Sequence, residues 1–380
     1  MRRLIPWGSA LLFTGALYAL ATFGPNIQAA LVARLGAGAY GLIPAPFLVA
    51  ATLLLLHTVR RRPGQTLSTL AAFALFAGLY AGCLRLLERP VEQIHFLLYG
   101  GLGGVVFWAL SRHIVGWVLY PWTLAVVYLV GMGDELIQWW LPNRVADFHD
   151  VLFDALGGAL GLALVALGVR PRAARGPLRP RQAQYMTGGI IVVAIATGGF
   201  LTSVHEFGYA IRDPEIGTFL TLFTAEEFRA LNGARLAATA DLASRDPRLR
   251  RFDVEARRHL RLEERHLKEG QLAEAASERA IVHHYYAAYL KVPGRLPDPA
   301  LPLDTLRRSP TAFQSEAYQG KIFTWFGQRA VWLAVAAFVF GGAGMMLVFA
   351  RALPPPDLSP ARWIARRASS RHAVAARRAP

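Results

Sequence analysis

The stretch GMGDELIQWWLPNRVADFHDVLFDALGGALG, residues 131–161, decides how the rest of the chain is read. It holds eight charged, titratable or hydrogen-bonding side chains: Asp134, Glu135, Gln138, Arg144, Asp147, His149, Asp150 and Asp154. Apolar segments long enough to cross a bilayer flank it on both sides. Charged side chains at a membrane boundary are costly unless they pair or act. The stretch therefore predicts a polar site held at one face of a membrane.

The composition is that of a polytopic membrane protein with a soluble portion. The chain has 380 residues, of which 54% are hydrophobic, and its mean hydropathy is +0.32. These values are typical of membrane proteins rather than of soluble enzymes. Cys83 is the single cysteine, so an intramolecular disulfide is excluded and the redox compartment cannot be inferred from cysteine usage.

Eight apolar segments are predicted to span the membrane, which makes the fold class an all-α polytopic membrane protein. Their lengths are close to the roughly 20 residues that cross about 30 Å of hydrocarbon. They cover residues 4–23, 40–59, 67–87, 94–110, 114–132, 151–169, 188–204 and 330–350. The first follows Arg2 and Arg3, as the apolar part of a signal peptide does, but its length favours a retained helix.

Positive charge predicts the orientation of these spans. A cytoplasmic N-terminus places most arginines on the cytoplasmic side and leaves few in the short outer loops. The net charge of +16 is then explained by topology and by contact with anionic lipid, so nucleic acid is not expected as a partner. We therefore expect a protein of the cytoplasmic membrane, with both termini inside and residues 205–329 outside.

Four regions follow from this topology. Residues 1–170 form a six-helix membrane domain, and residues 171–204 form a basic inner loop and the seventh span. Residues 205–329 are predicted to be a helical extracytoplasmic domain, and residues 330–380 are the last span with a basic cytoplasmic tail. Thr224 and Glu227 have the spacing of a capping box. Residues 252–290 resemble one tetratricopeptide-like hairpin, too little for a solenoid, so residues 205–329 are a small domain or half of a site for a protein partner.

Residues 90–104, PVEQIHFLLYGGLGG, add two side chains to the predicted site. His95 and Tyr99 lie four residues apart, so they share one face of a helix near the outer boundary. Gly100 and Gly104 form a GxxxG pattern, which predicts close packing on another helix.

The acids of the central stretch repeat the same helical spacing. Asp134 with Gln138, and Asp150 with Asp154, lie four residues apart. Asp at the start of a helix is often only a cap, but Asp154 lies one turn inside an apolar helix. It needs a partner, and Arg144 is the basic residue expected to pair with it.

These residues together resemble the VanZ-like family of small polytopic membrane proteins. The matching residues are His95, Phe96, Tyr99, Glu135, Gln138, Pro142, Arg144, Asp147, Asp150, Asp154 and Gly158. The resemblance covers roughly residues 1–170. The family usually carries Asn where this chain has Asp154, and often a basic residue where it has Glu92 and Gln93. The family's namesake is associated with resistance to glycopeptide antibiotics, so the resemblance implies an envelope role at the outer face, without a settled reaction.

Two classes of function remain open. In the first, the site engages a phosphate-bearing lipid headgroup or a lipid-linked cell-wall precursor. Arg144 then grips phosphate, His95 or a carboxylate serves as acid or base, and paired acids hold a divalent cation such as Mg²⁺. Catalytic positions are assigned to His95, Glu135, Arg144, Asp147, Asp150 and Asp154, and headgroup contacts to Tyr99, Asp134, Gln138 and Arg144.

In the second class, the same residues form a buried ion-pair lattice in a non-catalytic scaffold, and residues 205–329 recruit a partner. The sequence shows no nucleophile motif, no phosphate loop and no strong metal spacing, so no cofactor is evident. A transporter is a third alternative, but the broken, inverted segments typical of transporters are not seen.

Cysteine labelling tests the orientation. With Cys83 removed, single cysteines at Asn143 and Ala273 are expected to react with an impermeant thiol reagent added to intact cells. A cysteine at Gly176 is expected to stay unlabelled until the cells are opened. The reverse pattern would move the acidic stretch to the cytoplasm.

Overall fold

A computed structural model of the chain describes residues 4–36, 45–86, 90–141, 144–176, 180–233, 246–290 and 313–352. Residues 142–143, residues 291–312 and the predicted basic tail lie outside these ranges. The membrane region consists of α1 (Leu4–Leu35), α2 (Ala45–Arg61), α3 (Thr66–Leu86), α4 (Pro90–Leu110), α5 (Leu119–Trp140), α6 (Phe148–Leu164), α7 (Pro180–Val204) and α13 (Gln328–Ala352).

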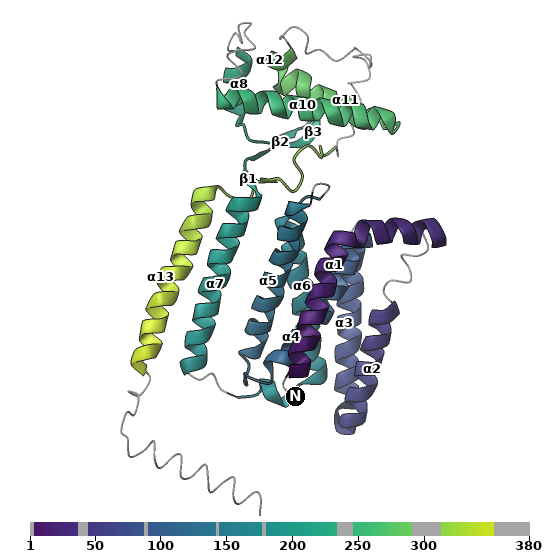
Figure 1. The fold of residues 1–380 in the computed structure, drawn as a ribbon, viewed down its shortest axis with the longest axis vertical. Helices are drawn as coiled ribbons and strands as arrows, with labels where there is room; N and C mark the ends of the chain where they lie inside the picture. Colours follow the sequence, from purple (N-terminus) through teal and green to yellow (C-terminus); the bar gives the residue numbers. More distant parts are fainter. Residues whose placement is uncertain are drawn as a thin grey trace, which may run out of the picture.

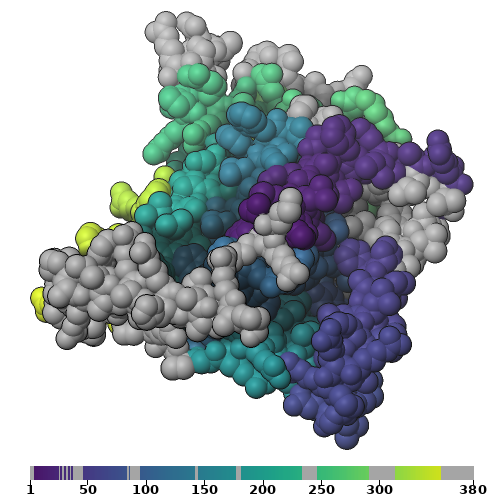
Figure 2. Space-filling model, turned by 60° about the horizontal axis from the view of Figure 1, so that its bottom comes forward, coloured from purple at the N-terminus to yellow at the C-terminus, as the bar shows by residue number. Residues whose placement is uncertain are grey.

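These helices run side by side and form one array (Figure 1). α1 begins and α13 ends at the same end of the array, and the outer segment lies beyond the opposite end (Figure 1). Figure 2 brings the first end forward and shows the hairpin of α2 and α3 at the edge of the array. Short connections join successive helices from α1 to α7, so their directions alternate, whereas the outer segment joins α7 to α13.

Five of the described helices are long and apolar enough to cross a membrane: Leu4–Gly24, Pro63–Cys83, Phe148–Val169, Arg181–Val204 and Gln328–Arg351. The prediction of a multi-pass, mostly helical protein is therefore confirmed. α4 contributes a shorter apolar helix, His95–Leu110. Two further predicted spans correspond to α2, which has 17 residues, and to α5, which carries Asp134 and Glu135 within its last turns.

The observed helices also extend past the predicted boundaries. α1 continues to Leu35 rather than ending near residue 23. α7 begins at Pro180, eight residues before the predicted start at residue 188. α5 runs to Trp140, past the predicted end of its span at residue 132, so Asp134 and Gln138 lie on one helix, as their spacing predicts. Hydropathy locates the apolar centre of each helix, whereas the ends that leave the apolar layer carry polar residues.

Glycines bring α4 and α6 into backbone contact. A Cβ at Gly157 would lie 2.5 Å from the Phe96 carbonyl oxygen, and one at Gly161 would collide with the Gly100 carbonyl. A Cβ at Gly103 would lie 3.0 Å from the Gly158 carbonyl oxygen. Glycines allow the two helix backbones to come this close. Such close packing matters in a bilayer, because the hydrophobic effect does not drive helices together in lipid.

The GxxxG prediction is only partly right. Gly100 lies in the contact, but a Cβ added at Gly104 would meet no described heavy atom within 4 Å. Gly103 takes that place, since it faces the Gly158 carbonyl of α6.

The outer segment is not wholly helical, which corrects the all-α prediction for this region. It contains α8 (Ala225–Gly233), α10 (Pro247–Lys268), α11 (Leu272–Tyr285) and α12 (Ala287–Leu290), but also four short strands. β2 (Tyr209–Asp213) pairs antiparallel with β3 (Gly217–Thr221), and β1 (Glu206–Phe207) pairs in parallel with β4 (Ile322–Phe323). The β1–β4 pair joins the two ends of the segment into a stem above α7 and α13 (Figure 1).

The helices of the outer segment pack on a core of aromatic side chains, and α10 and α11 form the predicted hairpin. The capping box is confirmed, because the backbone N–H of Thr224 donates to Glu227 and that of Glu227 donates to the Thr224 hydroxyl. Tyr286, which directly follows α11, is buried in this core. The Glu255 carboxylate beneath it accepts hydrogen bonds from the hydroxyls of Tyr286 and Thr221, at 2.6 and 2.7 Å.

The glycine contact generates a matched pair of variants. Gly157→Ala forces a side chain against the backbone of α4 and is expected to destabilise the protein by about 1–3 kcal/mol, the usual range for overpacking. Gly104→Ala meets open space and is expected to be neutral or to gain up to about 1 kcal/mol from helix propensity. Thermal unfolding in detergent measures both, and equal effects of the two substitutions would contradict the observed contact.

Candidate functional site

The residues of the predicted site come from α4, α5, α6 and the loop between α5 and α6. That loop lies at the end of the array that faces the outer segment (Figure 1). α4 supplies His95 and Tyr99, and α5 supplies Asp134, Glu135 and Gln138. Arg144 and Asp147 lie in the loop, and α6 supplies Asp150 in its first turn and Asp154 one turn later. The structure brings seven of these residues into two groups and pairs the Asp147 carboxylate with His149.

The first group is a chain of satisfied hydrogen bonds. The Glu135 carboxylate accepts from the Gln138 amide at 2.6 Å and from the backbone N–H of Asp147 at 2.8 Å. The Gln138 carbonyl oxygen accepts from Arg144 through Nε at 3.1 Å and Nη2 at 2.6 Å. Glu135 is fully buried, so this chain fixes the loop onto α5. Each bond satisfies a polar group that burial would otherwise make costly.

The predicted ion pair between Arg144 and Asp154 is wrong. Arg144 donates to the neutral Gln138 instead, and among the described residues it forms no ion pair with a carboxylate. The reason is geometric, because Glu135 holds the Gln138 amide so that its carbonyl oxygen faces the guanidinium.

The second group consists of polar side chains, several of whose buried atoms lack hydrogen-bond partners among the described residues. His95 Nδ1 lies 3.7 Å from Asp134 Oδ2 and 3.9 Å from Asp154 Oδ1. The two aspartate side chains are 2% and 1% exposed, whereas His95 is 23% exposed. Among the described residues, no hydrogen-bond partner serves Asp134 Oδ1, either carboxylate oxygen of Asp154, or the hydroxyl of Tyr99. His95, Tyr99, Asp134 and Asp154 are called the open cluster below.

Gly131 makes the room that the open cluster occupies. A Cβ at this position of α5 would lie 3.1 Å from Asp154 Oδ2. The ring of Tyr99 stacks near that of His95, with centroids 6.4 Å apart. Atoms from His95, Asp134 and Asp154 all lie within 4.8 Å of one another, so these three side chains have the spacing of a metal-ligand set.

Asp147 and His149 form a separate pair at the surface. Asp147 caps α6 by accepting from the backbone N–H of His149, and its carboxylate also lies 2.9 Å from the His149 ring nitrogen. Burial raises the pKa of Asp147, but the hydrogen bonds from His149 outweigh it and hold the pKa below its usual value. Asp147 therefore caps α6, as an aspartate at the start of a helix often does.

The stem of the outer segment rests directly on this loop. Gly320 adopts a positive φ of +71° and approaches the backbone of Ala146 and the side chains of Val145 and Asp147. His205 lies 3.1 Å from the Gly320 carbonyl oxygen through its Nδ1. Trp325 packs edge-on against His149, with ring centroids 4.7 Å apart. In the sequence, the signal for this contact is the group of aromatic residues just before the last span, Phe323, Trp325 and Phe326.

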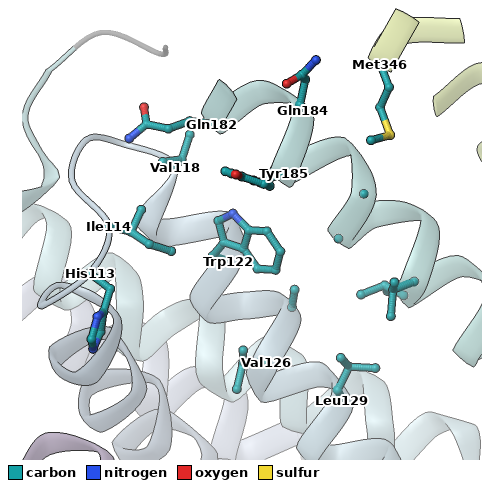
Figure 3. A pocket seen from close by; sticks show the side chains of 15 residues that line it. His113, Ile114, Val118, Trp122, Val126, Leu129, Gln182, Gln184, Tyr185 and Met346 are labelled. Atoms are coloured by element: carbon teal, nitrogen blue, oxygen red, sulfur yellow. The ribbon is translucent and has the colours of Figure 1, made fainter. Parts of the chain in front are cut away.

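An apolar pocket lies elsewhere, between α5, α7 and α13. Trp122 and Tyr185 face each other across it, and Val126, Leu129 and Met346 line it (Figure 3). None of the predicted site residues lines this pocket. Its apolar walls suit hydrocarbon rather than a polar group, so it is distinct from the open cluster.

Comparison with known families gives one assignment. Residues 50–169 match the family described as VanZ/LLP1. The match spans most of α2 through the end of α6, including the loop and the open cluster, so this region is a VanZ/LLP1 domain of a multi-pass membrane protein. The predicted resemblance is confirmed, although the match begins at residue 50 and leaves α1 outside. No curated protein and no solved structure matches the chain.

The division into two groups predicts opposite responses to isosteric substitutions. In buffer containing a chelator, Glu135→Gln replaces an acceptor by a donor and is expected to cost about 1–3 kcal/mol, the penalty for an unsatisfied buried group. Asp154→Asn removes a charge from a buried carboxylate that accepts no described hydrogen bond, so it is expected to leave the unfolding midpoint unchanged or raise it. Thermal unfolding of the purified protein distinguishes them, and a larger loss in Asp154→Asn would contradict the division.

Proposed function

We propose that the VanZ/LLP1 domain engages a phosphate-bearing lipid headgroup of the cell envelope through Arg144. One observation supports this proposal most strongly. Arg144 lies among several carboxylates, yet the described residues hold it through the neutral Gln138 rather than through an ion pair. A guanidinium oriented in this way keeps its full positive charge and has no described partner at Nη1, which suits the planar recognition of phosphate.

The position of the site is consistent with a headgroup ligand. Arg144 is half-buried and belongs to the loop between α5 and α6, at the end of the array that faces the outer segment (Figure 1). In an array that spans a bilayer, this end lies at the level of the headgroups. We infer that all eight helices span the membrane, with both termini in the cytoplasm and residues 205–329 outside. α2 and α13 end on the side of the array where α1 begins (Figure 1), and their last turns carry Arg60 and Arg351, as a positive-inside arrangement requires. A lipid-linked cell-wall precursor is the first ligand to test, because of the family's association with glycopeptide resistance.

A non-catalytic scaffold is the second candidate. The chain from Glu135 through Gln138 to Arg144 supports it, since these side chains satisfy one another and fix a loop. The same loop carries the stem of the outer segment through Gly320. In this alternative the outer segment recruits a protein partner. The polar residues then only hold the loop on which the outer segment rests.

Lipid binding to the purified protein separates the two candidates. Arg144→Lys keeps the charge but loses the two-pronged donor edge. We expect it to weaken binding of an anionic phospholipid by about 1.5–3 kcal/mol, the contribution of a hydrogen bond to a charged group. Native mass spectrometry in a mild detergent measures bound lipid, and unfolding is followed in parallel.

Arg112→Lys is the matched control. Arg112 follows the C-terminal end of α4, far from the α5–α6 loop, so this variant is expected to bind lipid as the original protein does. Normal folding with weakened binding in Arg144→Lys supports the headgroup site. Unchanged binding would contradict it, and loss of folded protein would favour the scaffold.

A further inference from the structure

We propose that His95, Asp134 and Asp154 bind one divalent transition-metal ion, for which Zn²⁺ is the best match. This inference goes beyond headgroup binding and does not depend on it. It rests on the geometry of three side chains, on buried oxygen atoms without partners, and on the chemistry of the donor set.

The geometry is close to that of a metal site. Three helices each contribute one ligand: His95 from α4, Asp134 from α5 and Asp154 from α6. His95 Nδ1 lies 3.7 and 3.9 Å from one oxygen of each aspartate. Zinc bonds of about 2.1 Å in a tetrahedron place neighbouring ligand atoms about 3.4 Å apart. Small side-chain rotations therefore bring all three atoms to bonding distance.

The unpaired oxygens indicate that a positively charged ligand belongs here. Both carboxylate oxygens of Asp154 and Oδ1 of Asp134 lack hydrogen-bond partners among the described residues, and both side chains are almost fully buried. Buried carboxylates without partners are strongly disfavoured. Arg144, the basic residue of the loop, donates to Gln138 and forms no described ion pair with either. A divalent cation compensates both charges at once.

The donor set favours a transition metal over Mg²⁺ or Ca²⁺. Imidazole nitrogen suits Zn²⁺, whereas Mg²⁺ and Ca²⁺ take oxygen ligands almost exclusively. Three protein ligands leave a fourth position for water or substrate. The buried Tyr99 hydroxyl, which also lacks a hydrogen-bond partner in the described part of the chain, belongs to the same cluster. His95, at 23% exposure, is the side chain through which the cluster is reached.

Two other histidine–carboxylate pairs show what sets this cluster apart. His259 and Glu278 are fully buried and lie 2.6 Å apart, but Ser315 also donates to Glu278, so the carboxylate is satisfied. His149 and Asp147 are satisfied too, and His149 is 52% exposed. Neither pair is joined by a second described carboxylate within reach. His149 therefore provides a control from the same loop region.

Metal binding by the full chain tests the proposal. The protein is purified in detergent through a tag without histidine, and its metal content is measured by mass spectrometry before and after dialysis against a chelator. Zn²⁺ is then titrated into the stripped protein in competition with a fluorescent chelator. Co²⁺ provides a spectroscopic probe, since tetrahedral Co²⁺ absorbs strongly in the visible range. The variants are His95→Ala, Asp154→Asn and the control His149→Ala.

We expect about one tight ion per chain, and a visible Co²⁺ spectrum of nitrogen and oxygen ligation. Loss of an outer-shell partner typically weakens metal affinity about 10- to 100-fold, so His95→Ala and Asp154→Asn are expected to weaken it by more than that. His149→Ala is expected to bind as the original protein does. Absence of a tight ion and of the Co²⁺ spectrum in the original protein overturns the proposal even if a variant fails to fold. Equal loss in His149→Ala, or none in the two ligand variants, also overturns it.

Discussion

The backbone contact between α4 and α6 is the constraint on which the site depends. Gly157 lies against the carbonyl of Phe96, the residue that follows His95, and it is one turn from Asp154. A side chain at that position would separate the two helices and, with them, the histidine and the aspartate. Lipid offers little reward for burying apolar surface between helices, so close packing of small residues must hold such a contact together. Glycines such as Gly157, which have no side chain, therefore set the distance between the helices that carry His95 and Asp154.

The two groups of polar residues solve the same energetic problem in different ways. Glu135 is buried but satisfied, so its charge or proton is held within a fixed chain of partners. Asp134 and Asp154 are buried without such partners among the described residues. Removing one member of a buried polar group typically costs more than the group contributes when complete. The satisfied chain therefore fixes the loop onto α5, whereas the open cluster retains buried oxygen atoms that accept no described hydrogen bond.

The sequence predicts the membrane class, the VanZ-like resemblance and the residues that gather near the α5–α6 loop. It does not predict which of them touch. Arg144 is close to Asp154 along the chain, and His95 is far from it. In space, however, His95 is the neighbour of Asp154. Partners across helices depend on rotation and crossing angle, which single glycines such as Gly103 decide. The strands were missed because β1 and β4 each have two residues, too short for an alternating pattern, and pair across the whole outer segment.

Through Gly320, the outer segment contacts Val145 and Ala146 in the loop between α5 and α6. The β1–β4 pair holds both ends of that segment together above α7 and α13. The loop beneath Gly320 carries Arg144, and the backbone N–H of its Asp147 donates to Glu135 on α5. The outer segment and a buried carboxylate of the helix array are therefore joined by one continuous series of contacts.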